Sequence, residues 1–299
     1  MAHAWRPRML LVALALVATS TTACGVAARG FSGKRALQHV EAQCALGPRP
    51  VGSEAAGQTA DYIVKHLETS GWDVEEQSFA YGEKPLRNVI GKKGTGPLVI
   101  LGTHFDTRPV ADRDPDNRSV PVLGANDGAS GTAVLLELAR VLGKEATDQA
   151  EIWLAFFDGE DHGELNGWPW CVGSTHMANN LTRRPEYVIV LDMIGDADQQ
   201  IYYEWSSSLW LQERLWTLAE EMGYRRQFVP EHRYSVLDDH SPFLQRGISA
   251  ALVIDFDYPY WHTVHDTPDK VSADSLQRVG DVLERLLEGE PFAQTPNTP

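Results

Sequence analysis

Acidic and imidazole side chains lie at or just after the ends of the long apolar segments of this chain. Four such segments cover residues 98–103, 152–157, 187–193 and 249–254. These side chains, with one more before a predicted helix, are His104, Asp106, Asp127, Asp158, Glu160, Asp161, Asp192 and His262. Carboxylates that share one site repel one another and need a cation or protons to coexist. Nitrogen and carboxylate ligands without thiolate suit a catalytic zinc ion that keeps an open coordination position.

Each of these residues has an ordinary explanation when it is taken alone. Asp127 would cap a helix, Asp161 would be a solvated turn residue and His262 an ordinary loop histidine. Their arrival from several segments at one edge of a sheet disfavours these separate explanations. We therefore predict a metal site formed by Asp127, Asp161 and His262. Glu160, next to one ligand, is free to move a proton.

Apolar strands and amphipathic helices alternate along the chain and must position these residues. The strands are predicted over 72–79, 87–92, 98–103, 152–157, 187–193, 200–204 and 249–254. Apolar residues at helical spacing predict helices around 36–44, 53–67, 135–142, 211–222 and 276–286. The alternation indicates one α/β domain with a mixed, mostly parallel central sheet and helices on both faces. Such sheets bind ligands at the carboxyl ends of their strands. The long polar segment 107–126 is a loop, and loops of this length are usually functional or disordered.

The chain is acidic, with a formal net charge of −15 over 299 residues. Nucleic acid is therefore a poor partner, because phosphate binding requires a basic surface. Solubility is the plain explanation of the charge. The hydrophobic content of 43% is ample for a large core.

The first 23 residues have the pattern of a signal peptide. Arg6 and Arg8 precede an apolar run over 9–17, and small residues then lead to Cys24. The string Thr22-Ala23-Cys24-Gly25 resembles a bacterial lipoprotein cleavage box, with simple secretion as the alternative. We predict an exported protein, either a cell-envelope lipoprotein anchored to the membrane through lipid on Cys24 or a secreted one. Its divisions are a signal peptide 1–23, a linker 24–35, a catalytic domain 36–290 and a flexible tail 291–299.

Cys44 and Cys171 remain after Cys24 is assigned to lipid. Their spacing carries no disulfide signal, so buried free thiols are the expectation. Pairing is the alternative that an oxidising compartment would allow.

Seven ordered motifs resemble the zinc aminopeptidase and glutaminyl cyclase superfamily over about residues 36–287. The motifs are His104-Phe-Asp106, Gly124-Ala-Asn-Asp-Gly-Ala-Ser-Gly131, Phe156-Phe-Asp-Gly-Glu-Asp161, Gly173-Ser174, Leu191-Asp192-Met193, Asp238-Asp-His240 and His262-Thr263. The resemblance implies a peptide or protein amino terminus as substrate.

The two branches of this superfamily imply different zinc counts. In the aminopeptidase branch, His104 and Asp192 would hold one ion, Asp161 and His262 a second, and Asp127 would bridge them. In the cyclase branch, a single ion would be held by Asp127, Asp161 and His262. Asp192 would then join Asp238 in a supporting hydrogen-bond network, with Glu160 as the proton shuttle.

Several features favour the cyclase branch, closest to its bacterial members. Trp261 precedes His262 as in the cyclase Trp-His-Thr string, where the indole walls the substrate pocket, and Trp170 is a second candidate for that wall. The segment from Asp238 to Gly247 is close to the cyclase form. Two departures stand out: residues 250–254 lack the histidine of animal cyclases, and Asp161 replaces their glutamate ligand. The resemblance implies a one-zinc glutaminyl-peptide cyclotransferase that forms pyroglutamate from amino-terminal Gln, with a zinc aminopeptidase as the alternative.

Overall fold

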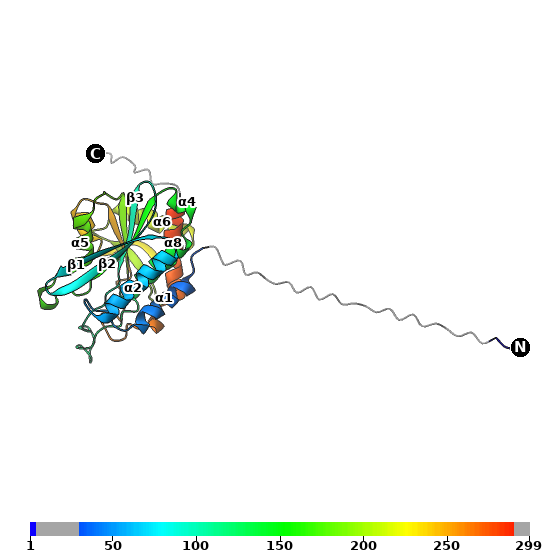
Figure 1. Cartoon of the computed structure of the whole chain (residues 1–299), viewed down its shortest axis with the longest axis horizontal. Helices are drawn as coiled ribbons and strands as arrows, with labels where there is room; N and C mark the ends of the chain where they lie inside the picture. The colour runs from blue at the N-terminus through cyan, green and yellow to red at the C-terminus, as the bar shows by residue number, and fades with distance from the viewer. Residues whose placement is uncertain (4–29, 290–299) are drawn as a thin grey trace.

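The computed structural model describes residues 1–3 and 30–289. Within that part, a six-stranded sheet with the strand order β1-β2-β4-β3-β5-β8 forms the centre of the molecule (Figure 1). Its strands are β1 (Asp73–Tyr81), β2 (Lys84–Gly94), β3 (Leu98–His104), β4 (Glu151–Phe157), β5 (Tyr187–Asp192) and β8 (Ala250–Ile254). β3 pairs in parallel with both β4 and β5, and β5 pairs in parallel with β8. β1 and β2 form an antiparallel extension beside β4, so the sheet is mixed, as predicted.

Helices cover both faces of this sheet. One apolar core joins it to α1 (Gly33–Ala45), α2 (Glu54–Thr69), α3 (Ala129–Val141), α6 (Leu209–Glu221) and α8 (Ala273–Glu288). A second core joins the opposite face to α5 (Val172–Asn180) and α7 (Ser241–Gln245). The parallel strands β3, β4, β5 and β8 are therefore buried on both faces, which explains why they read as continuous apolar runs. No helix in the described residues is long and apolar enough to cross a membrane.

The predicted elements are present, with differences at their ends. α1 begins at Gly33, inside the predicted linker, because the Ser32 side chain accepts a hydrogen bond from the Arg35 amide and caps the helix. The short α4 (Lys144–Thr147) and β7 (Phe228–Tyr234) were not predicted, and neither were α5 and α7. β7 pairs in parallel with β6 (Ile201–Glu204) in a separate two-stranded sheet. The predicted signal peptide after residue 3, Cys24 and the tail lie outside the described residues.

Gly131 allows α3 to lie directly against the sheet beneath the predicted site. A Cβ atom at this position would stand 2.8 Å from the Leu191 carbonyl oxygen and would collide with the Thr103 hydroxyl. Gly57 in α2 is different, because a Cβ atom there would meet nothing within 4 Å. The two glycines therefore offer a matched test of the packing between α3 and the sheet.

We expect Gly131→Ala to lower the free energy of unfolding by about 1–3 kcal/mol, because the added methyl group overpacks the contact between α3 and the sheet. Gly57→Ala should raise it by about 0.4–1 kcal/mol, because alanine reduces the freedom of the unfolded chain. Urea unfolding of both variants measures the two changes. Equal effects of the two substitutions would contradict the close approach of α3.

Candidate metal centre

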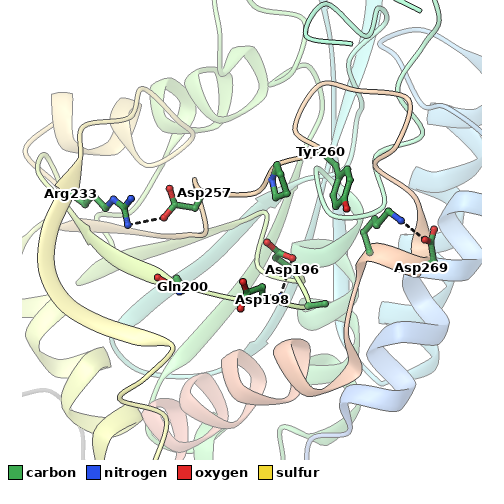
Figure 2. Close-up of a pocket in the computed structure, with 10 residues that line it drawn as sticks. Asp196, Asp198, Gln200, Arg233, Asp257, Tyr260 and Asp269 are labelled. Atoms are coloured by element: carbon green, nitrogen blue, oxygen red, sulfur yellow. Dashed lines mark hydrogen bonds and ion pairs between the residues drawn. The ribbon is translucent and has the colours of Figure 1, made fainter. Parts of the chain in front are cut away.

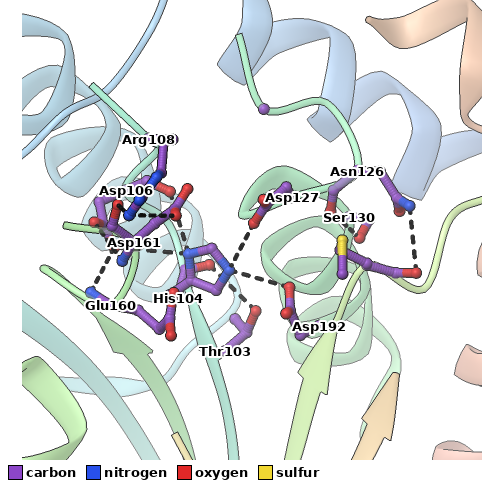
Figure 3. Close-up of polar contacts among 12 residues, drawn as sticks. Thr103, His104, Asp106, Arg108, Asn126, Asp127, Ser130, Glu160, Asp161 and Asp192 are labelled. Atoms are coloured by element: carbon purple, nitrogen blue, oxygen red, sulfur yellow. Dashed lines mark hydrogen bonds and ion pairs between the residues drawn. The ribbon is translucent and has the colours of Figure 1, made fainter. Parts of the chain in front are cut away.

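The predicted ligands meet at the carboxyl ends of the parallel strands. Figure 3 shows His104, Asp127, Asp161 and Asp192 close together there, and His262 contacts Asp161. His104 and Asp192 are the last residues of β3 and β5. Asp127 lies just before α3, and Asp161 follows β4. His262 lies in the segment between β8 and α8. The residues predicted from the sequence to form a metal site therefore lie together at one edge of the sheet.

Asp127, Asp161 and His262 form one group with the geometry of a metal site. Each offers a ligand atom, these atoms all lie within 4.8 Å of one another, and all three residues are buried. His262 Nε2 lies 3.0 Å from Asp161 Oδ1 and 3.7 Å from Asp127 Oδ2. Asp127 Oδ2 and both Asp161 carboxylate oxygens are buried without a hydrogen-bond partner. Buried oxygens of this kind are costly unless a cation is bound, so the donor set fits zinc.

His104, Asp127 and Asp192 form a second group that shares Asp127 with the first. His104 Nε2 lies 3.1 Å from Asp192 Oδ1, with which it forms a hydrogen bond, and 3.2 Å from Asp127 Oδ1. Although burial lowers the pKa of His104, its contacts with Asp106, Asp127 and Asp192 raise it well above its ordinary value. These three carboxylates therefore favour the protonated form of the imidazole.

Asp106 holds the segment that carries Glu160 and Asp161. Its two carboxylate oxygens accept hydrogen bonds from the backbone amides of Glu160 and Asp161, at 3.1 and 3.2 Å. The loop after β4 is fixed by these bonds, because backbone amides bound to a carboxylate are among the stronger hydrogen bonds in proteins. Asp106 therefore fixes the backbone that carries a ligand and the candidate proton shuttle.

Asp266 holds the segment that carries Asp127 in the same way. Its oxygens accept from the amides of Asn126 and Asp127, at 2.8 and 3.1 Å, and from the Tyr258 hydroxyl at 2.7 Å. α3 has Gly128 at its N-cap position and no side-chain capping bond. The ordinary explanation of Asp127 as a helix cap is therefore not observed, and its carboxylate points to the metal groups instead.

The carboxyl groups of the site have perturbed pKa values. Burial raises the pKa of Glu160 well above its ordinary value, and the nearby carboxylates of Asp238 and Asp239 raise it further. Burial and the Asp127 carboxylate raise the pKa of Asp161 to about 7. Perturbation of this size in one cleft is typical of functional sites.

A pocket of about 220 Å³ opens over the first group. The acidic part of its wall includes Glu160, Asp192 and Asp238, and the aromatic part includes Trp170, Phe256 and Trp261. Burial raises the pKa of Asp238 well above its ordinary value, and the carboxylate of Asp192 adds to the effect. Every residue predicted for catalysis or substrate binding therefore faces the same small cavity.

A larger pocket, of about 490 Å³, shares no lining residue with the first (Figure 2). Its wall contains the ion pairs of Arg233 with Asp257 and of Lys270 with Asp269, together with Asp196 and Asp198. Among the described residues, both groups with metal-ligand spacing lie at the strand ends and neither lies here. The smaller pocket is therefore the candidate active site.

Some residues of the site were not given a role from the sequence. Asp106 belongs to one of the motifs quoted above, and Asp266 lies just after the His262-Thr263 motif, but their bonds to backbone amides could not be foreseen from residue type. Asp112, which contacts His262, lies in the polar loop 107–126. The length of that loop and the resemblance of residues 108–115 to bacterial cyclase-like members indicated a function, but neither gave Asp112 a role. Cys44 and Cys171 are both free thiols, as expected, but only Cys171 is buried, and Cys44 is half-buried. The Cys171 thiol lies 3.6 Å from Glu160 Oε1.

The fold and the donor set together define a metal-dependent enzyme of the α/β class. Residues 88–287 match the model of peptidase family M28, and the chain belongs to this family. The resemblance noted in the sequence is thereby confirmed.

Known members of both branches are similar to this chain. It is 30% identical over 231 residues to aminopeptidase YwaD of Bacillus subtilis, a match that covers 68% of this chain and 44% of the relative. It is 28% identical over 284 residues to the glutaminyl-peptide cyclotransferase of Drosophila melanogaster, covering 81% and 78% of the two chains. The crystal structure of Tannerella forsythia glutaminyl cyclase superposes with a TM-score of 0.82 at 32% identity, covering 87% of this chain and 99% of that one.

We expect zinc to stabilise the protein by binding to the first group. At a free zinc concentration of about 100 times Kd, the free energy of unfolding should rise by about 2.7 kcal/mol relative to chelated protein. Differential scanning calorimetry with chelator or added zinc measures this change. His262→Ala should abolish the zinc response, whereas His265→Ala, an exposed neighbour, should keep it. A full zinc response in the His262→Ala variant would remove His262 from the ligand set.

Proposed function

We propose that this protein is a zinc-dependent glutaminyl-peptide cyclotransferase, which converts amino-terminal Gln of peptides to pyroglutamate and releases ammonia. The observation that carries the proposal is the contrast between the two ligand groups. Asp127 Oδ2 and both Asp161 oxygens of the first group make no hydrogen bond, although Asp161 Oδ1 lies 3.0 Å from His262 Nε2, whereas His104 and Asp192 form a hydrogen bond with each other. This contrast supports a single ion held by Asp127, Asp161 and His262, which is the cyclase arrangement.

The reaction requires proton transfer beside a polarised amide. When bound, zinc supplies a Lewis acid that polarises the side-chain carbonyl of the substrate glutamine. Glu160, in the wall of the same pocket, takes a proton from the terminal amine as its nitrogen attacks the amide carbon. Ring closure forms one carbon–nitrogen bond, and the bond to the departing nitrogen breaks. Glu160 returns the proton to that nitrogen, which leaves as ammonia.

The pocket favours this reaction by holding a small substrate end away from water. Amine and amide belong to one residue, so the enzyme needs only to hold the folded conformation in which they meet. Trp170 and Trp261 supply flat apolar walls, and the volume of about 220 Å³ suits a single terminal residue. Asp192 and Asp238 lie in the acidic wall, where they would bind and orient the amine.

We expect Glu160→Gln to lower turnover by about 10²–10⁴-fold while zinc stays bound, because the amide cannot transfer the proton. Ammonia release from a Gln-peptide measures the turnover, and the zinc content of the same sample shows whether zinc stays bound. Glu164→Gln is the matched control, because this exposed glutamate lies four residues further on. Near-normal turnover of the Glu160→Gln variant would refute its role as proton shuttle.

A zinc aminopeptidase is the second candidate function, and one observation favours it. Asp127 belongs to both groups, so the chain has the shared carboxylate that a two-zinc centre requires. In that case Glu160 would activate a water molecule for hydrolysis.

Product identity and metal content separate the two functions. With a Gln-peptide, we expect ammonia and a peptide of unchanged residue number, together with one zinc per chain by elemental analysis. Free glutamine, a peptide shortened by one residue and two zinc ions per chain would support the aminopeptidase instead.

Export and lipid attachment at Cys24 form a separate part of the proposal. They are supported by the basic, apolar and small-residue order of residues 1–23 and by the cleavage-box resemblance around Cys24. Mass spectrometry of the mature amino terminus, compared between the natural chain and Cys24→Ser, tests the attachment.

A further inference from the structure

Asp112 contacts the metal-facing histidine from its far side. His262 Nδ1 lies 3.1 Å from Asp112 Oδ1, and the imidazole Nδ1–H donates this hydrogen bond to the carboxylate. The other ring nitrogen, Nε2, faces Asp127 and Asp161. A carboxylate on Nδ1 fixes the proton there and leaves the Nε2 lone pair for the metal.

Arg108 holds Asp112 in this position. Its Nη2 lies 2.5 Å from Asp112 Oδ2, and its Nε lies 3.2 Å from the same oxygen. Arg108 is itself buried and fixed, because Nη1 donates to the backbone oxygens of Asp161 and Gly163 at 3.2 and 2.8 Å. The guanidinium group also lies 4.8 Å from the centre of the Trp170 ring. One arginine therefore links Asp112, the backbone of a ligand and a wall of the pocket.

Arg113 attaches the same loop to the His262 backbone. Its amide donates to the His262 carbonyl oxygen at 3.2 Å, and its guanidinium lies 3.8 Å from the Trp261 ring centre. His262 has a φ of +56°, a conformation that residues other than glycine rarely adopt. Strained backbone of this kind persists only where its surroundings hold it, and the contacts of Asp112 and Arg113 do so.

We propose that Asp112 is a positioning residue for the metal centre: supported by Arg108, it sets the tautomer and the orientation of His262. Asp112 does not reach the metal group itself, and its contribution passes through the imidazole. The inference rests on the metal centre of the proposed function, but it holds for a cyclase and for an aminopeptidase alike. The polar loop that contains Asp112 thus contacts two predicted ligands, Asp161 and His262, and two tryptophans of the pocket wall, Trp170 and Trp261.

Zinc affinity measured by competition with a chromophoric chelator tests this role without any substrate. We expect Asp112→Ala to raise the zinc Kd by about 10–100-fold, the usual cost of losing a partner of a ligating histidine. Asp112→Asn should raise it less, because the amide oxygen still accepts from Nδ1–H but carries no charge. Asp116→Asn is the control, since Asp116 is exposed. This substitution removes a charge from the same loop and should leave the zinc Kd unchanged.

Thermal unfolding of the metal-free variants separates positioning from a loss of folding. An increase in zinc Kd without a matching loss of metal-free stability supports the proposal. A folded Asp112→Ala variant with the zinc Kd of the natural protein overturns it. If the alanine variant does not fold, Asp112→Asn decides, and an unchanged Kd in that variant also overturns it. If the natural protein binds zinc but shows no cyclase activity, the proposed function fails, whereas the role of Asp112 in zinc binding still stands.

Discussion

The structure depends on the accommodation of many buried carboxylates at one edge of its sheet. Asp127, Glu160, Asp161 and Asp238 are all buried there, and an uncompensated buried charge costs several kcal/mol. His104 and His262 offset part of the negative charge, and burial and mutual repulsion raise most of the carboxyl pKa values. Three of the buried oxygens without a hydrogen bond, Asp127 Oδ2 and both oxygens of Asp161, belong to one group with metal-ligand spacing. A divalent cation resolves this imbalance, and the rest of the site is arranged around its place.

Two pairs of these buried carboxylates differ in what they bind. Asp106 and Asp266 each accept from two consecutive backbone amides, and so they fix the loops after β4 and before α3. Asp127 and Asp161 stand on those loops with oxygens free for a metal. Short strands buried on both faces deliver the loops to one edge, and Gly131 lets α3 close beneath them. Rigid elements and amide-binding carboxylates together give the precision that a catalytic site requires.

The sequence predicted what depends on apolar periodicity and residue type, and missed what depends on backbone geometry. The strands β3, β4, β5 and β8 were predictable because burial on both faces makes them apolar throughout. β7 was not, since its residues are mostly exposed and include Pro230. The ligands were recognisable as strand-end acids and imidazoles. The roles of Asp106, Asp266 and Asp112 were not, because each depends on which backbone amide or ring nitrogen the fold brings within reach.

X-ray diffraction from zinc-loaded crystals, recorded on either side of the zinc absorption edge, tests the central claim most directly. The account predicts one anomalous peak, placed between the Asp127 and Asp161 carboxylates and His262 Nε2, with Glu160 beside it. A second peak between His104 and Asp192 would still confirm metal binding by the first group, but it would favour the aminopeptidase. Zinc bound at another place, with the first group empty, would contradict the account.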